Sequence, residues 1–176
     1  MEIQTITFET TDQTATEIKT GCLIIGVFSD RPAGEQLTAI DEATDGLLTE
    51  MGEDGELSLG AGKTLMIHRP RKINARRLLI TGLGKASRFD DATFLRSAKA
   101  AGTALRQSRA TDAVCLLGQI ELDGRDRGWK TTQTALALDH ADYIYSATKA
   151  ADADAAPATD RIAFPIGKGV EEALTT

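Results

Sequence analysis

Apolar runs of strand length alternate along this chain with stretches in which apolar residues recur at helical spacing. The run from Cys22 to Phe28 is almost continuously apolar, which is typical of a strand covered on both faces of a sheet. Shorter runs follow at Thr64 to His68, Leu78 to Thr81, Ala113 to Leu117 and Ile162 to Ile166. Strands and helices in alternation predict an α/β domain with a mainly parallel or mixed sheet between helices.

The segments between these runs have helical spacing. One helical stripe is expected after Pro32, which suits the first turn of a helix. Asp90 or Asp91 can cap a second helix, and a third is expected from Thr131 to about Ala147. The apolar faces consist of Leu37, Ile40, Leu47, Leu48 and Met51 in the first helix, and of Phe94, Leu95, Ala98, Ala101 and Leu105 in the second.

Three further segments complete the pattern. Ile3 to Phe8 alternates apolar and polar residues, as a half-buried strand does. Ser146 to Asp160 is rich in alanine and aspartate and is predicted to be an exposed loop. Glu171 to Thr176 has the character of the first turn of a helix.

Composition limits the classes of function. A chain of 176 residues is long enough for one domain with a sizeable core. Its net charge of −6 argues against nucleic acid or an anionic membrane as a partner, because both require positive charge. No apolar run approaches the ~20 residues of a membrane span, and the acidic start lacks the features of a secretory signal. Cys22 and Cys115 lie in separate apolar runs, which predicts buried, reduced thiols in a soluble cytoplasmic domain.

A glycine-rich turn is the best-placed candidate for a binding site. The turn from Gly82 to Lys85 follows a predicted strand and precedes a predicted helix. Its backbone N–H groups could hold an anion, with Gly82, Gly84 and Lys85 as the ligand-binding residues. Ser87 stands where the dinucleotide-binding pattern requires its third glycine. A tight turn that needs a positive φ angle is therefore the favoured interpretation, and the ligand turn stays open beside it.

A second glycine-rich segment does not fit a phosphate loop. Gly60 to Thr64 matches the end of that motif, but Leu57 stands where its first glycine is required. The residues that follow have the character of a strand, whereas a phosphate loop opens a helix.

One basic cluster stands out in this acidic chain. It brings no aromatic residue for stacking on bases, so a solvated loop or a subunit contact is favoured over a DNA-binding patch. The cluster consists of His68, Arg69, Arg71, Lys72, Arg76 and Arg77.

The paired carboxylates carry no predicted chemistry. Asp90–Asp91, Glu171–Glu172 and Asp152 with Asp154 lie at a helix cap, at the chain end and in a loop. A two-metal hydrolase needs several carboxylates that converge on ions roughly 3.5–4 Å apart. His140 is expected on a helix surface. No catalytic residue and no metal ligand is assigned.

Arg125 and Trp129 form the candidate interface. Trp129, the only tryptophan, is expected to begin the third helix and to pack one ring face on the core. Arg125 lies just upstream, where it can pair with a carboxylate across a domain or subunit interface.

Three segments together carry a family resemblance. Arg76 to Lys85 is a buried strand that ends in a glycine turn, Gly124 to Lys130 is a basic turn that contains Trp129, and Gly26-Val27-Phe28 closes the first apolar strand. In order and spacing, from about Ile3 to about Val170, the chain resembles the amino-terminal domain of the leucyl aminopeptidases, the cytosol aminopeptidase family. The resemblance implies a three-layer, macro-domain-like fold over residues 1–170, with 171–176 as the start of a truncated interdomain helix.

The resemblance also implies what lies outside this chain. Family members carry two divalent ions, zinc or manganese, in a carboxy-terminal catalytic domain with an Asn-Thr-Asp-Ala-Glu-Gly-Arg signature. That string does not occur here. We therefore expect a non-catalytic domain of a peptide-hydrolysing homohexamer, with the family's catalytic domain as its partner and no cofactor of its own. The alternatives are a stand-alone macro-like module that binds an ADP-ribose-type ligand at the Gly82 turn, and weak DNA binding by the basic cluster.

Overall fold

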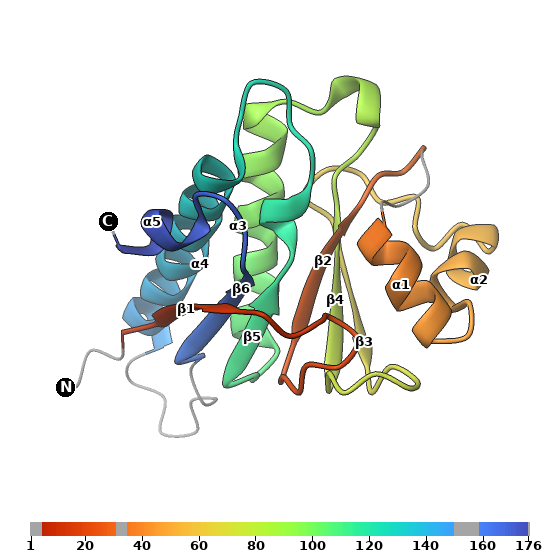
Figure 1. Cartoon of the computed structure of the whole chain (residues 1–176), viewed down its shortest axis with the longest axis horizontal. Coiled ribbons are helices and arrows are strands. Elements are labelled where there is room, and N and C mark those ends of the chain that lie inside the picture. Colours follow the sequence, from red (N-terminus) through yellow and green to blue (C-terminus); the bar gives the residue numbers. More distant parts are fainter. Residues whose placement is uncertain (1–4, 31–34, 150–158, 176) are drawn as a thin grey trace.

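The computed structural model describes residues 5–30, 35–149 and 159–175. In these ranges six strands form one sheet in the order β1-β6-β5-β2-β4-β3 (Figure 1). Neighbouring strands are parallel, except that β3 runs antiparallel to β4. The predicted mixed sheet is confirmed. The strands are β1 Thr7–Thr11, β2 Leu23–Val27, β3 Thr64–His68, β4 Arg77–Gly82, β5 Asp112–Cys115 and β6 Arg161–Pro165.

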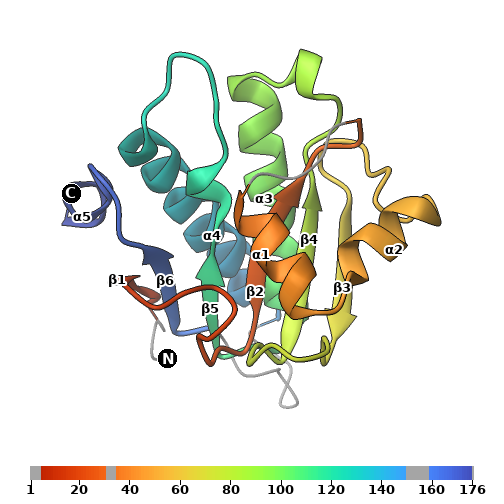
Figure 2. The same cartoon turned by 45° about the vertical axis from the view of Figure 1, so that its right-hand side comes forward.

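Helices cover both faces of the sheet, which gives three layers. Helices α1 (Glu35–Ala43) and α2 (Leu47–Glu53) lie on the near face in Figure 2, and α3 (Asp91–Gln107) and α4 (Arg127–Lys149) lie behind it. The short α5 (Val170–Thr175) follows β6, and two 3-10 turns, at Ala86–Arg88 and Leu117–Gln119, follow β4 and β5. The expected α/β, macro-like architecture is therefore present.

Strand β2 shows why this sequence requires two helical layers. Successive side chains of a strand point to opposite faces of the sheet. Leu23 and Ile25 pack into the core beneath α1 and α2, whereas Ile24 packs into the core beneath α3 and α4. All three side chains are fully buried. A strand with water on one face would place a polar residue at every second position.

The predicted single helix after Pro32 is wrong. The chain forms two helices, because Asp45 and Gly46 adopt positive φ angles of 57° and 79°. The N–H of Gly46 donates to the carbonyl oxygen of Asp41 at 2.7 Å and closes the first helix. Leu48 and Met51 are nevertheless buried, as predicted. Pro32 itself lies outside the described residues.

The observed bounds of β1 and α4 differ from those predicted from the sequence, because strand pairing and helix packing set them. The first strand is Thr7–Thr11, where it pairs in parallel register with β6. It contains Thr7 and Phe8 of the predicted strand Ile3–Phe8, whose first two residues lie outside the described ranges. Helix α4 begins at Arg127, four residues before the predicted start, and runs to Lys149, beyond its predicted end at about Ala147 and into the segment 146–160 that was predicted to be loop. The rest of that predicted loop lies largely outside the described residues. Within the described ranges, no helix combines the length and apolar character needed to cross a membrane.

Candidate functional site

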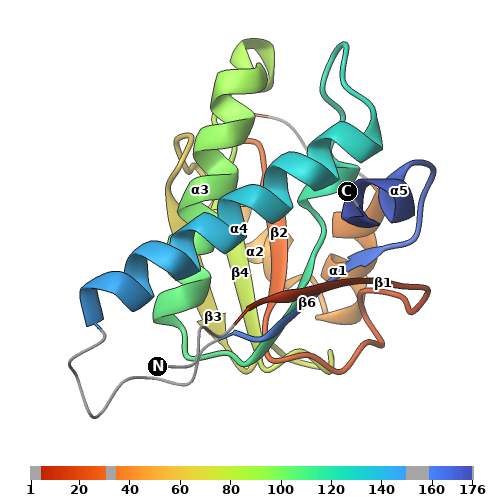
Figure 3. The ribbon, with the colours of Figure 1, turned by 90° about the vertical axis from the view of Figure 1, so that its left-hand side faces the viewer.

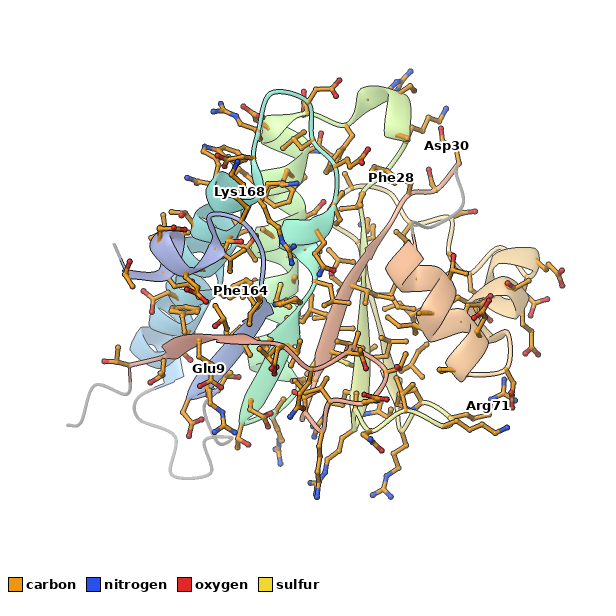
Figure 4. The ribbon with its side chains drawn as sticks, in the orientation of Figure 1. Glu9, Phe28, Asp30, Arg71, Phe164 and Lys168 are labelled. Carbon is orange, nitrogen blue, oxygen red and sulfur yellow. The ribbon has the colours of Figure 1, made fainter. Side chains whose placement is uncertain are left out.

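The carboxyl ends of β2, β4, β5 and β6 meet at one edge of the sheet, the edge where ligands bind in open α/β folds. The Gly82–Lys85 turn lies at this edge, at the end of β4. Phe28 and Asp30, which follow β2, lie at the same edge in the upper part of Figure 4. Arg71 of the basic cluster lies at the opposite edge. The structure therefore places the Gly82–Lys85 turn and Arg71 of the basic cluster at opposite edges of the sheet.

Two backbone donors of the Gly82 turn are already engaged within the chain. The N–H of Gly82 donates to the carbonyl oxygen of Lys63 at 2.7 Å, and the N–H of Leu83 donates to that of Val27 at 2.9 Å. Among the described residues, no acceptor is paired with the N–H groups of Gly84 and Lys85. At most two donors of the turn therefore face a ligand.

A carboxylate stands beside the turn. The N–H of Ala86 donates to Oδ1 of Asp30 at 3.0 Å, so the next donor along the chain is satisfied by an acidic side chain. Gly84 has a φ angle of 73°, which glycine adopts without strain. This geometry favours the tight-turn interpretation over an anion site.

The helix after the turn is not available to an anion either. Helix α3 begins at Asp91, six residues after Lys85. Oδ1 of Asp90 accepts the N–H of Thr93 at 2.9 Å and caps the helix. The pKa of Asp90 lies below its ordinary value, because the backbone N–H and then the hydroxyl of Thr93 donate to the carboxylate. Asp90 is therefore a structural cap, as predicted.

The segment from Gly60 to Thr64 meets the Gly82 turn directly. Thr64 begins strand β3, as expected, and no helix follows the glycines. The N–H of Gly62 donates to the carbonyl oxygen of Gly82 at 3.1 Å. The two glycine-rich segments therefore pack on each other, although nothing in the sequence indicated that they are in contact.

Arg125 and Trp129 lie together at the start of α4. The guanidinium carbon of Arg125 is 4.3 Å from the centroid of the Trp129 ring. Its Nε and Nη2 donate to Oδ2 of Asp91 at 3.0 Å and 2.6 Å. This contact raises the pKa of Arg125. The carboxylate partner seen here belongs to the same chain, and the pair ties the loop before α4 to α3.

Trp129 continues an aromatic chain that sequence reasoning missed. Its ring centroid is 6.0 Å from that of Phe94, which lies 6.3 Å from Phe89, which in turn lies 5.0 Å from Phe28. The backbone N–H of Trp129 donates to Oδ1 of Asp126 at 2.7 Å. These rings join the end of β2 and the loop before α3 to the first turns of α3 and α4. No local pattern signals this, because the four residues come from three separate segments.

Two basic residues at the amino end of α4 also hold this edge together. Nη2 of Arg127 donates to the carbonyl oxygen of Pro165 at 3.1 Å, and Nζ of Lys130 donates to that of Ile120. Desolvation lowers the pKa of both side chains, and for Lys130 the neighbouring Arg127 lowers it further. Their donors are directed at the last residue of β6 and at the loop that follows β5, so they anchor these segments to α4.

A hollow of about 450 Å³ lies beside the ends of β5 and β6. Its floor is apolar, with Val114, Leu116, Pro165 and Ile166, and the loop of residues 11–16 forms its polar rim. Ile166 is 50% exposed. The hollow could receive a small apolar group.

The basic cluster is partly neutralised. Nζ of Lys72 is 2.7 Å from Oδ2 of Asp45, and Nη2 of Arg71 is 3.6 Å from Oε2 of Glu50. The acidic partners come from the α1–α2 region. Two basic side chains of the cluster are therefore paired with carboxylates of the same chain, which agrees with the interpretation as a solvated loop.

The remaining candidates carry no site. His140 is exposed, as predicted, and Asp152 with Asp154 lie outside the described residues. Cys22 and Cys115 are free and buried, and burial raises the pKa of each thiol to about 12. In the described part of the chain, no group of three or more His, Cys, Asp or Glu residues could hold a metal ion.

Sequence comparison places the chain beside one group of enzymes. Residues 24–152 match the model of the cytosol aminopeptidase family, N-terminal domain. A probable cytosol aminopeptidase of Nitrosomonas eutropha is 31% identical over 146 residues, 83% of this chain and 29% of the relative. A probable cytosol aminopeptidase of Paraburkholderia phytofirmans is 34% identical over 155 residues, 88% of this chain and 30% of the relative. The chain thus spans less than a third of the length of these relatives.

Solved structures share the fold. A mutant of tomato leucine aminopeptidase superposes with a TM-score of 0.73 and 15% identity over 99% of this chain and 36% of that chain. The macrodomain of Mycobacterium tuberculosis DarG superposes with a TM-score of 0.62 and 12% identity over 92% of this chain and 99% of that chain. At these identities the likeness concerns architecture alone.

Proposed function

The chain belongs to the cytosol aminopeptidase family, whose N-terminal domain it matches, and on that premise we propose that it is the non-catalytic amino-terminal domain of a two-metal leucyl aminopeptidase. The observation that carries the proposal is the family match over residues 24–152, with the aligned part of this chain spanning only 29% and 30% of two relatives. The parent enzyme would release N-terminal residues from peptides in the cytoplasm. Residues 1–170 would form the domain, and 171–176 would begin the helix toward a carboxy-terminal catalytic domain.

The chemistry of the parent enzyme would belong to that other domain. Two divalent ions, zinc or manganese, would supply an activated water and polarise the scissile carbonyl. The described residues of this chain do not fit such a centre, because they contain no group of three or more His, Cys, Asp or Glu residues that could hold a metal ion. Asp90 caps α3, and Asp91 pairs with Arg125. We assign this domain no metal ligand and derive no catalytic step from it.

The domain's own contribution would be assembly of a homohexameric particle. Its carboxyl edge is held rigid by the aromatic chain and by the loop anchors Arg127 and Lys130. Arg125 and Trp129 lie at this edge, and the Arg125 side chain is 40% exposed. A rigid edge with an exposed arginine over an aromatic ring suits contact with a neighbouring domain or subunit.

A direct assay tests the proposal. The purified chain is incubated with leucine 4-nitroanilide and with Mn²⁺ or Zn²⁺, beside the product of the full reading frame as the positive control. We expect turnover only in the control. Chelator-sensitive turnover by the 176-residue chain itself would overturn the proposal. Reading the gene past codon 176 gives an independent check, because we expect the frame to continue into the Asn-Thr-Asp-Ala-Glu-Gly-Arg signature.

The macro-like architecture keeps one alternative open: a stand-alone module that binds an ADP-ribose-type ligand at Gly82, Gly84 and Lys85. Only the N–H groups of Gly84 and Lys85 remain for such a ligand, and Asp30 lies beside them. Calorimetry with ADP-ribose separates the two proposals. Binding with a micromolar dissociation constant would favour the module, and the absence of a measurable heat of binding would favour the enzyme domain. DNA binding has less support, because the net charge is −6 and Arg71 and Lys72 contact acidic residues of the chain.

A further inference from the structure

Helices α3 and α4 cross each other on one face of the sheet (Figure 3), and side chains of both helices line a groove. The groove has a volume of about 700 Å³. One wall comes from the first half of α3 and the other from the middle of α4. The lining residues are Leu95, Arg96 and Lys99 on α3 and Gln133, Leu136, Ala137, Asp139 and His140 on α4.

Two large apolar side chains are exposed in this groove. Leu136 is 59% exposed and Leu95 is 38% exposed. The opposite sides of the same helices are packed normally, since Phe94 and Leu138 are almost fully buried. The two leucines are therefore not needed to hold α3 and α4 on the sheet. Neighbouring exposed apolar groups within a polar rim are typical of an interaction surface.

The charges of the two walls are opposite. The α3 wall carries Arg96 and Lys99, and the α4 wall carries Asp139. None of these three side chains forms a salt bridge within the described residues. A partner that carries charges of only one sign would be attracted to one wall and repelled by the other. A partner that presents the same two walls in reverse order satisfies both.

A second copy of this chain is such a partner. In a two-fold contact each patch meets its own equivalent, so the α3 wall of one copy faces the α4 wall of the other, and each charge pair occurs twice. The leucines of the two copies then face each other across the contact and exclude water. We propose that the α3–α4 groove is a self-complementary interface that pairs two copies of this domain through Leu95 and Leu136, with Lys99 opposite Asp139 of the second copy.

Mass in solution tests the apolar part of the proposal. Sedimentation of the chain is followed from about 1 µM to about 1 mM, the range of weak specific association. We expect a concentration-dependent species of twice 18.8 kDa. Leu136→Glu should remain at 18.8 kDa with an unchanged melting temperature, because the side chain is already exposed. The matched control is Ile166→Glu, at a position that is 50% exposed and does not line the groove, and this variant should still pair.

A charge exchange tests the arrangement of the walls. Lys99→Glu and Asp139→Lys each place two like-charge contacts in the pair, so each should weaken association at least about tenfold. The double variant restores opposite charges and should regain the mass of the pair. A wild-type chain that stays monomeric at every concentration, or a double variant no better than the single ones, would overturn the proposal. The readout is mass, so the result is independent of the peptidase assay.

Discussion

Gly82→Ala is the substitution that most directly tests how the candidate turn is built. A methyl group at position 82 would lie 2.6 Å from Cβ of Leu59 and against the carbonyl oxygen of Gly60. Backbone atoms carry part of this contact, and hydrogen bonds of Gly82 to residues 62 and 63 hold the two segments together. Gly82 is not among the residues with a positive φ angle. Any cost is therefore steric and does not come from backbone strain.

The size of the effect follows from overpacking. An extra methyl group in a tightly packed site costs about 1–3 kcal/mol. We expect the upper end, about 3 kcal/mol, because the backbone of residues 59–60 cannot turn away as a side chain does. For a chain of this size each kcal/mol lowers the melting temperature by about 2–4 °C, so a fall of about 6–12 °C should be seen.

Urea unfolding followed by circular dichroism measures the change in free energy. The matched control is Gly52→Ala in α2, where the nearest atom to the new methyl group, Cδ1 of Leu57, is 3.9 Å away. This control should stabilise the chain by about 0.5 kcal/mol, because alanine favours a helix. If the free energy of unfolding of Gly82→Ala lies within about 0.5 kcal/mol of that of the wild-type chain, close packing of the two segments is not the reason for glycine at position 82.

Three further predictions follow from buried and capping groups. Nε of Arg106 and Oδ1 of Asp142 are 3.1 Å apart, and their side chains are only 7% and 10% exposed. Asp142→Asn should therefore lower the free energy of unfolding, measured in urea, by about 3 kcal/mol, because it leaves a buried charge without its partner. The double variant Arg106→Met with Asp142→Leu removes both charges and should regain most of this lost stability. The thiols of Cys22 and Cys115, with pKa raised to about 12 by burial, should not react with a thiol reagent at pH 8 until urea unfolds the chain, and rapid native-state labelling would contradict this burial. The folded-state pKa of Asp90 lies below its ordinary value of 3.8, so its stabilising contribution is present above 3.8 and is lost as the pH falls through the lower folded value. Asp90→Asn keeps a cap but does not titrate, so urea midpoints should fall less steeply with acid than in the wild-type chain.

Much of the fold followed from local patterns. The strand Thr64–His68 has the predicted bounds, and the strand within Cys22–Phe28 is buried on both faces, as its continuous apolar run indicated. The break between α1 and α2 was not predicted. Apolar spacing continues across Asp45 and Gly46, and only their positive φ angles separate the two helices.

The sequence did not reveal which groups pack against the candidate residues. Sequence placed the Gly82 turn at a strand end, but residues 59–62 pack over it from a segment about twenty positions away. It also paired Arg125 with Trp129, while the carboxylate that holds Arg125 is Asp91, 34 residues upstream. A glycine or an arginine in the sequence indicates where a close contact can form, but it does not identify the residue on the other side of that contact.

The sequence by itself determined the alternation of strands and helices, the two buried faces of β2 and the family to which the chain belongs. These depend on spacing and side-chain type, which are local properties of the chain. Tertiary structure alone decided that Arg106 meets Asp142 and that Leu95 and Leu136 share one groove. Those contacts depend on how α3 and α4 cross, and the crossing is set where Gly102 lets α3 approach Ala137 and Ala141 of α4. Packing of whole elements, which no single segment encodes, brings such residues together.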